Sequence, residues 1–262
     1  MNPFKHALLS GQRLLGTWMM TGSDTVAEAM ATVGFDFLVL DQEHVAVDTL
    51  DAIRIDRAIR SISATTPLYR LAGNELVLMK RALDGGAMSL MIPFINTVEE
   101  AQQAVAAAFY PPYGKRGFAA MHRASGWGGN AQFVQEARDE LCLILQLETP
   151  EAIANIDAIA RVDGITGFFI GPGDLSSAMG QPGNPSHPEV QRMITHGLDA
   201  CQRLGKPCGI VGGNPDLVNK YQQMGFNFVA LASDMSFMLA RAKEQLAAIR
   251  GENLTVPGGE VY

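Results

Sequence analysis

Cysteine is scarce in this chain, and long apolar runs are absent. The three cysteines, Cys142, Cys201 and Cys208, are an odd number and lack the two-residue spacing of a zinc knuckle or redox pair. This excludes a disulfide framework and predicts three reduced thiols. No apolar run approaches the roughly 20 residues that a membrane span needs, and the N-terminus contains no secretory signal pattern. We therefore expect a cytoplasmic protein with no membrane partner.

Positive charge is also limited. Lys and Arg number 20 against 27 Asp and Glu, which gives a net charge of −7, and no basic cluster occurs. Nucleic-acid binding is thereby excluded, because phosphate contacts need clustered Lys and Arg. Hydrophobic residues make up 47% of the sequence and are spread evenly, which excludes a disordered chain. The length of 262 residues fits a single (β/α)₈ barrel, whose usual size is about 250 residues.

The sequence contains eight short apolar runs, and a helical pattern follows each of them. These runs do not alternate between polar and apolar residues, which is typical of parallel strands buried on both faces. The expected strands are 14–20, 35–41, 67–72, 87–93, 141–148, 164–171, 207–212 and 226–232. The expected helices are 25–33, 49–61, 74–83, 97–108, 150–161, 187–204, 215–224 and 234–250. Eight such units predict a closed (β/α)₈ barrel, with a doubly wound open sheet as the alternative.

We expect the barrel to span residues 1–250 as one catalytic domain. The segment 110–140 interrupts the alternation of strands and helices and is predicted to be a long insertion rich in Pro, Gly and Arg. An insertion of this length in a compact domain is usually functional or disordered. Residues 251–262 are expected to form a tail outside the barrel.

Polar side chains gather where the expected strands end. Asp41, Glu43 and His44 follow the second strand, and Arg70 ends the third. Gln146 and Glu148 end the fifth strand, and Asp174 follows the sixth. Because the carboxyl ends of barrel strands meet at one rim, these residues predict an active site there.

Two of these acids predict a metal site. Thr149 is the better cap for the helix that follows Glu148, which leaves a buried carboxylate in need of a partner. Asp174 is a second candidate ligand, although helix capping is an alternative role for it. Two carboxylates without a Cys or His pair favour Mg²⁺ or Mn²⁺ in an open, catalytic site.

The turn Gly171-Pro172-Gly173 is not a dinucleotide fingerprint, because Ser176 stands where the third glycine belongs. Its backbone N–H groups suit a carboxylate or phosphate instead.

The remaining rim residues suit acid–base chemistry. The planar guanidinium of Arg70 can bind an oxyanion through two parallel N–H donors. His44 titrates near neutrality and is the natural general base, with a strand-end histidine bonded to backbone as the alternative. Asp41 could orient its imidazole. Lys80 lies in an expected helix and Lys115 in a loop, so neither is a desolvated Schiff-base lysine, which argues for metal-dependent rather than imine-forming catalysis.

The combined motifs resemble the class II, metal-dependent pyruvate aldolases, a family that includes 4-hydroxy-2-oxoheptanedioate aldolase and the 2-keto-3-deoxy sugar-acid aldolases. The likeness runs from about residue 12 to residue 250. The motifs that carry it are LGTW (15–18), DQEH (41–44), YRLAGNE (69–75), IPFINTVEEAQ (92–102), the segment 110–128, LQLETPEAIANID (145–157) and the segment 167–190.

The resemblance implies a barrel of the pyruvate/phosphoenolpyruvate type, with the last helix exchanged between subunits of a hexamer built as a trimer of dimers. It implies a divalent metal on Glu148 and Asp174, with Mg or Mn favoured and Co, Ni or Zn as other candidates. Arg70 would face the enolate oxygen, and Asp41 and His44 would form an acid–base dyad. Gln146 would bind near the pyruvate oxygen, and the amides of Gly173 and Asp174 would hold the pyruvate carboxylate.

The implied reaction is the reversible cleavage of a 4-hydroxy-2-keto acid into pyruvate or hydroxypyruvate plus an aldehyde, through a metal-stabilised enolate. His122 and Arg123 would border the aldehyde pocket. Weaker pocket candidates are Trp18, Glu43, Arg116 and Trp127. Two alternatives are a lyase of coenzyme A thioesters, such as malyl- or citramalyl-CoA, and a non-catalytic barrel.

Overall fold

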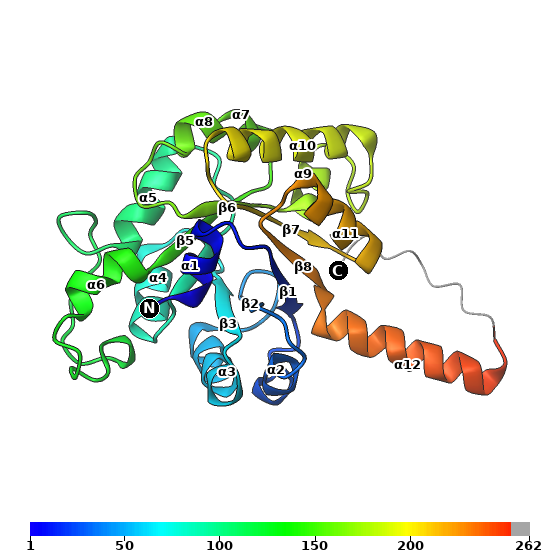
Figure 1. Cartoon of the computed structure of the whole chain (residues 1–262), viewed down its shortest axis with the longest axis horizontal. Helices are drawn as coiled ribbons and strands as arrows, with labels where there is room; N and C mark the ends of the chain where they lie inside the picture. The colour runs from blue at the N-terminus through cyan, green and yellow to red at the C-terminus, as the bar shows by residue number, and fades with distance from the viewer. Residues whose placement is uncertain (253–262) are drawn as a thin grey trace.

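The computed structural model describes residues 1–252. Eight parallel strands pair in chain order, and β1 also pairs with β8, so the sheet closes into a barrel (Figure 1). The strands are β1 (Leu14–Met19), β2 (Phe37–Asp41), β3 (Thr66–Arg70), β4 (Ser89–Ile92), β5 (Cys142–Leu147), β6 (Gly167–Ile170), β7 (Cys208–Gly212) and β8 (Phe228–Ser233). This confirms the predicted (β/α)₈ barrel and excludes the open sheet.

Helices cover the outside of the strands. They are α2 (Asp24–Ala31), α3 (Thr49–Ile62), α4 (Leu76–Asp84), α5 (Val98–Ala108), α7 (Pro150–Ala154), α8 (Ile156–Ile159), α9 (Pro172–Ala178), α10 (Pro188–Arg203) and α11 (Pro215–Met224). A further helix, α12 (Asp234–Arg250), follows β8. The single helix predicted over 150–161 is wrong. It breaks at Asn155, whose side-chain amide donates a hydrogen bond to the carbonyl of Asn96 at 2.8 Å.

Helix α1 (Pro3–Leu9) closes the amino end of the barrel and was not predicted from the sequence. Phe4 packs against Phe37 and Phe228, with ring centroids 5.3 and 5.6 Å apart. The side chain of Asn2 is buried and donates to the carbonyl of Met88 at 2.8 Å. A seven-residue helix with two buried residues is too short to produce a clear helical period.

Two apolar layers stabilise the barrel. One fills the interior of the barrel, and the other lies between the strands and the helices. Successive strand residues point to opposite sides, so Phe37 and Val39 face the interior while Leu38 and Leu40 face the helices. This alternation also decides which residues at the strand ends point into the mouth of the barrel.

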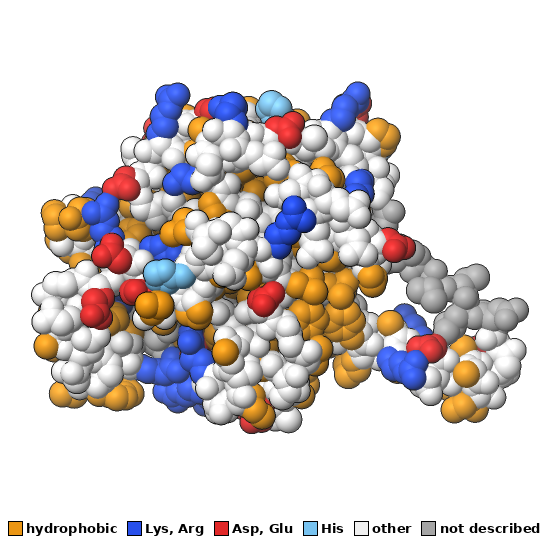
Figure 2. Space-filling model, in the orientation of Figure 1, with side chains coloured by type: hydrophobic (Ala, Val, Ile, Leu, Met, Phe, Trp, Pro, Cys, Tyr) orange, Lys and Arg blue, Asp and Glu red, His pale blue; other side chains and the backbone are white. Residues whose placement is uncertain are grey.

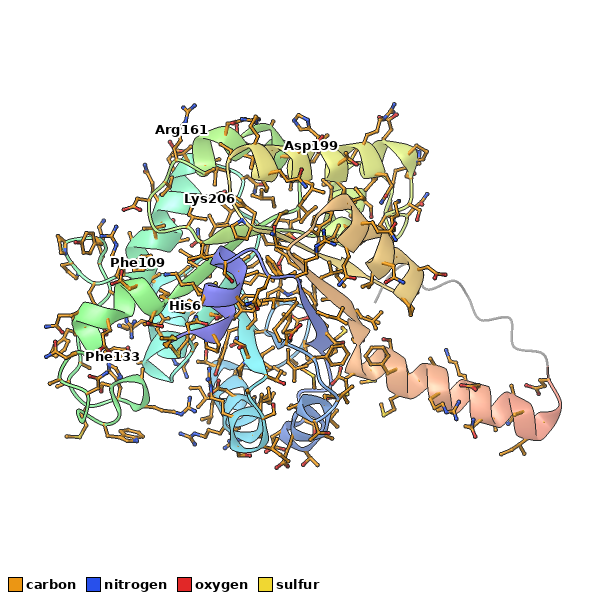
Figure 3. The ribbon with its side chains drawn as sticks, viewed as in Figure 1. His6, Phe109, Phe133, Arg161, Asp199 and Lys206 are labelled. Atoms are coloured by element: carbon orange, nitrogen blue, oxygen red, sulfur yellow. The ribbon has the colours of Figure 1, made fainter. Side chains whose placement is uncertain are left out.

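The insertion between α5 and β5 contains a short 3₁₀ helix (Arg123–Ser125) and helix α6 (Phe133–Glu140). Helix α6 was missed because it buries no residue and so has no apolar stripe against the core. Phe133, labelled in Figure 3, packs edge-on against the ring of His122.

Helix α12 extends away from the barrel as an arm (Figure 1). Its first residue, Asp234, anchors it by accepting hydrogen bonds from the backbone of Met20 at 2.7 Å and from the hydroxyl of Thr21 at 2.6 Å. The arm carries exposed apolar side chains (Figure 2), among them Met238, Leu239, Leu246 and Ile249.

The predicted tail begins at Gly251, which ends α12 in a left-handed conformation, and residues 253–262 lie outside the described part. Within residues 1–252, no helix is both long and apolar enough to cross a bilayer.

Candidate active site

Strand register places Asp41 and Arg70 side by side. They are paired residues at the ends of β2 and β3, and both continue the interior face of their strands. Arg70 Nε donates to Asp41 Oδ1 at 3.0 Å, and Arg70 Nη2 donates to Asp41 Oδ2 at 2.6 Å. Both side chains are fully buried. Such a two-point pair fixes the orientation of the guanidinium as well as its charge.

Asp41 also fixes the turn that follows β2. Its Oδ1 accepts the backbone N–H of Glu43 at 2.9 Å and that of His44 at 3.3 Å. The imidazole of His44 faces Asp174 instead, with Nε2 3.5 Å from Oδ2. The carboxylate of Asp41 is directed to Arg70 and to backbone amides, and the Asp41–His44 acid–base dyad stays a prediction.

Glu43 contributes a second carboxylate to Arg70. Its Oε2 lies 3.1 Å from Arg70 Nη1, and its side chain is nearly buried. Burial raises the pKa of Glu43 above its usual value, even though the neighbouring Arg70 lowers it. Glu43 also faces Asp174 closely enough for the two acids to repel each other.

Gln146 and Glu148 continue the interior face of β5 that Cys142 and Ile144 begin. The side-chain amide of Gln146 donates to Glu148 Oε2. The backbone N–H of Phe94 donates to Glu148 Oε1 at 2.8 Å. Phe94 has a positive φ of 52°, a strained conformation for a non-glycine residue. Phe94 was not predicted as a site residue, because its contribution comes from the backbone and its side-chain type gives no signal.

Glu148 is fully buried, and its partners in these two hydrogen bonds are uncharged. Burial, followed by the nearby charge of Glu43, raises the pKa of Glu148 to about 8. A buried carboxylate of this kind is stabilised by a cation, because the cation offsets both desolvation and repulsion.

Gly171, which follows β6, leaves room for the Glu148 carboxylate. A Cβ atom added at Gly171 would lie 2.5 Å from Glu148 Oε2 and 3.0 Å from Gln146 Nε2. The requirement for glycine is therefore steric, and the sequence indicated only a turn at this position.

Asp174 lies in the first turn of α9, next to Gly173. Its carboxylate faces His44 and is partly exposed. Asp174 also acts with Glu43 to raise the pKa of Glu148, so the three carboxylates are neighbours. Within residues 1–252, no group of three or more Asp, Glu, His or Cys is arranged to hold a metal ion. The oxygen donors of Glu148 and Asp174 suit a divalent cation that takes its remaining ligands from substrate and water.

The two predicted tryptophans lie in different environments. Trp18 is fully buried in the barrel interior, 4.8 Å beneath the guanidinium carbon of Arg70. Trp127 is exposed on the insertion.

Two arginines tie the insertion to the outer helices. Arg116 pairs with Asp84 at 2.7 Å, and Arg123 pairs with Asp56 at 2.7 Å. Arg123 also donates to the carbonyl of Gly85, which precedes β4. These contacts place His122 and Arg123 at the amino end of the barrel, so the expectation that they border the aldehyde pocket of their own barrel is wrong.

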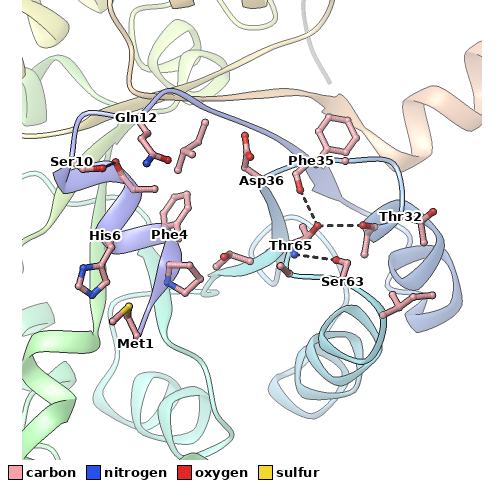
Figure 4. A pocket seen from close by; sticks show the side chains of 18 residues that line it. Met1, Phe4, His6, Ser10, Gln12, Thr32, Phe35, Asp36, Ser63 and Thr65 are labelled. Carbon is pink, nitrogen blue, oxygen red and sulfur yellow. Dashed lines mark hydrogen bonds between the residues drawn. The ribbon is translucent and has the colours of Figure 1, made fainter.

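A cavity of about 1010 Å³ lies at the amino end, between α1 and the segments that precede β2 and β3 (Figure 4). Asp36 and Thr65 line it, and Thr65 donates its hydroxyl hydrogen to the carbonyl of Phe35. This cavity opens away from the acids described above. The chemistry-bearing residues gather at the carboxyl ends instead, where barrel enzymes place their sites.

A closed (β/α)₈ barrel with buried acids and a fixed arginine at the carboxyl ends of its strands defines a barrel enzyme. Sequence comparison identifies the family. The model for the HpcH/HpaI aldolase/citrate lyase family matches residues 14–240, and the chain belongs to that family.

Named relatives agree with this assignment. The chain is 48% identical to a 2-dehydro-3,6-dideoxy-6-sulfogluconate aldolase of Pseudomonas putida, over 90% of this chain and 92% of the relative. It is 42% identical to a hydroxypyruvate/pyruvate aldolase of Sagittula stellata, over 92% of this chain and 95% of the relative. A crystal structure of an HpcH/HpaI aldolase/citrate lyase family protein from Burkholderia cenocepacia superposes with a TM-score of 0.93 at 33% identity, covering 95% of this chain and all of that one. The family resemblance and the prediction of an aldolase-type carbon–carbon lyase are confirmed.

Proposed function

We propose that the protein is a divalent-metal-dependent aldolase that cleaves a 4-hydroxy-2-keto acid into pyruvate, or hydroxypyruvate, and an aldehyde. The observation that carries the proposal is the juxtaposition of two clusters at the barrel mouth. One is the buried carboxylate of Glu148 beside Asp174, and the other is Arg70 held by Asp41. The relatives named as aldolases favour this reaction over the cleavage of a coenzyme A thioester.

Glu148 and Asp174 would hold the metal, with Mg²⁺ or Mn²⁺ favoured by their oxygen donors. When bound, a divalent cation supplies Lewis acidity at the keto oxygen of the substrate. Gln146 orients Glu148 through its side-chain amide and would also bind near the pyruvate oxygen.

Arg70 would stabilise the enolate that forms when the C3–C4 bond breaks. Its guanidinium is fixed before substrate arrives, so little reorganisation is needed during the reaction. The first backbone amides of α9, at Gly173 and Asp174, would receive the substrate carboxylate.

His44 would move the proton in cleavage. Its Nε2 accepts the proton of the C4 hydroxyl group, and the nearby Asp174 carboxylate stabilises the imidazolium that results. The side chain of His44 is 45% exposed, so solvent can exchange this proton.

The proposal also covers the class of substrate and the oligomeric state. The substrates are small molecules, a keto acid and an aldehyde, and the chain forms a homo-oligomer through the exposed apolar face of α12. A hexamer is the assembly that the family resemblance implies. Analytical ultracentrifugation would measure its size.

Incubation with pyruvate in deuterated water tests the donor half of the reaction. We expect the methyl protons of pyruvate to exchange in the presence of Mg²⁺ or Mn²⁺, because enolate formation releases one of them. Exchange should stop after treatment with EDTA and return when metal is restored. NMR measures the loss of the methyl signal, and full exchange in thoroughly metal-stripped protein would contradict the proposal.

Replacing Gly171 by Ala should lower metal affinity about tenfold or more, the range seen when the partners that orient metal ligands are disturbed. The added methyl group would displace the Glu148 carboxylate. Gly73→Ala is the matched control, because a Cβ there meets no atom within 4 Å. Isothermal titration with Mn²⁺ measures both variants, and equal affinities would show that Gly171 has no steric role at the site.

A further inference from the structure

The guanidinium of Arg70 meets two carboxylates in different ways. Asp41 holds Nε and Nη2 through two hydrogen bonds, and backbone amides hold Asp41 in turn. Glu43 Oε2 makes a single ion-pair contact with the third nitrogen, Nη1, at 3.1 Å. The Asp41 contact is therefore the fixed one, and the Glu43 contact is the one that a ligand can replace.

The location of Glu43 supports its replacement at Arg70 by a ligand. It contacts Arg70, and its charge also acts on the neighbouring acids Glu148 and Asp174, both of which it repels. The keto acid of the proposed reaction is an anion that must enter this same space. Its oxyanion would compete with the Glu43 carboxylate for Nη1, and binding would have to move that carboxylate away.

We propose that Glu43 is a positioning residue that occupies the Nη1 edge of Arg70 until an anionic keto acid arrives, and that it thereby sets the affinity of the site for that acid. The inference rests on the proposed function, since it assumes that the ligand of Arg70 is a keto acid. Glu43 lowers the affinity for the anion, because its carboxylate and the anion would bind the same edge of the guanidinium.

Trp18 provides an optical probe of the replacement of Glu43 by a ligand at Arg70. It lies 4.8 Å beneath the guanidinium of Arg70, and the sequence contains one other tryptophan, Trp127, which is exposed. In a Trp127→Phe background, Trp18 emission therefore reports on Arg70. Oxalate, a planar anion that resembles the pyruvate enolate, serves as the ligand at saturating Mg²⁺.

We expect Glu43→Gln to shift the oxalate titration of Trp18 emission to about three- to tenfold lower concentration, as one charged competitor for a charge-assisted hydrogen bond is removed. The KM for pyruvate in methyl exchange should fall by a similar factor, with kcat changed less. Weaker metal binding in Glu43→Gln would raise the oxalate midpoint and the KM for pyruvate, so it cannot account for a decrease in both. Glu75→Gln is the control, because Glu75 is exposed at the same end of the barrel and caps α4 without a side-chain hydrogen bond.

An unchanged or higher oxalate midpoint in Glu43→Gln would overturn the inference, because Glu43 would then support Arg70 instead of competing for it. Methyl exchange by the unsubstituted protein separates the two proposals. Normal exchange with an unshifted midpoint would contradict the inference alone. A shifted midpoint without any exchange would contradict the aldolase proposal and leave the competition at Arg70 standing.

Discussion

Replacing Arg70 by Ala should reduce the rate of pyruvate methyl exchange by about 10²- to 10³-fold, the loss typical of removing one oxyanion-stabilising donor. The guanidinium is fully buried and held at two points by Asp41, so its removal takes a fixed, preorganised donor out of the site. NMR in deuterated water measures the exchange rate at saturating pyruvate and Mg²⁺.

Two controls accompany this variant. Arg81→Ala removes an exposed arginine from α4 and should leave exchange unchanged. Arg70→Lys keeps the charge but loses the fork that binds Asp41, so it should recover little of the rate. Removing Arg70 also leaves Asp41 buried without its partner, at a cost of about 3–5 kcal/mol, so thermal melting must confirm that the variant is folded. Exchange at the wild-type rate would remove Arg70 from the proposed mechanism.

Replacing Glu148 by Gln should abolish metal-dependent exchange and, in metal-free protein, increase stability at alkaline pH. Glu148 has a pKa of about 8 in the folded chain, against an ordinary value of 4.5. The folded state therefore binds a proton that the unfolded state releases, and stability falls as the pH rises from about 4.5 to about 8. Glutamine removes this dependence, so the variant should be more stable by roughly 3–5 kcal/mol at pH 8–9.

Urea unfolding in EDTA at pH 5 and at pH 9 measures this difference. The two proteins should be nearly equal at pH 5 and separate at pH 9. Glu151→Gln changes an exposed glutamate three residues away and should follow the unsubstituted protein at both pH values. A variant that is destabilised equally at both pH values would contradict the raised pKa. It would indicate that the Glu148 carboxylate is needed for packing alone.

The ends of the predicted strands lie no more than three residues from the observed ones, because buried parallel strands leave continuous apolar runs in the sequence. The elements that were missed leave weaker patterns. Helix α1 is short, and α6 buries no residue, so neither has an apolar stripe long enough to identify. The break at Asn155 depends on a hydrogen bond to Asn96, a residue 59 positions earlier in the chain.

The polar residues of the site were predicted for a related reason. Asp41, Arg70, Gln146 and Glu148 each continue the interior face of an apolar strand, and the twofold alternation of a strand carries that face into the barrel mouth. Phe94 could not be found in this way, since it acts through a backbone amide. Gly171 could be identified as a turn, but its closeness to Glu148 depends on how β5 and β6 are aligned.

The sequence by itself determined the barrel and the set of polar residues at its carboxyl end, because both depend on local periodicity and on where each strand stops. The tertiary structure decided which of these residues meet. In the structure Asp41 pairs with Arg70, and the imidazole of His44 faces Asp174. Glu43 contacts the third nitrogen of the guanidinium. The tertiary structure also fixed the insertion to the opposite end of the barrel through Arg116 and Arg123. Such pairings join residues from different strands and loops, so they depend on the closure and register of the whole sheet.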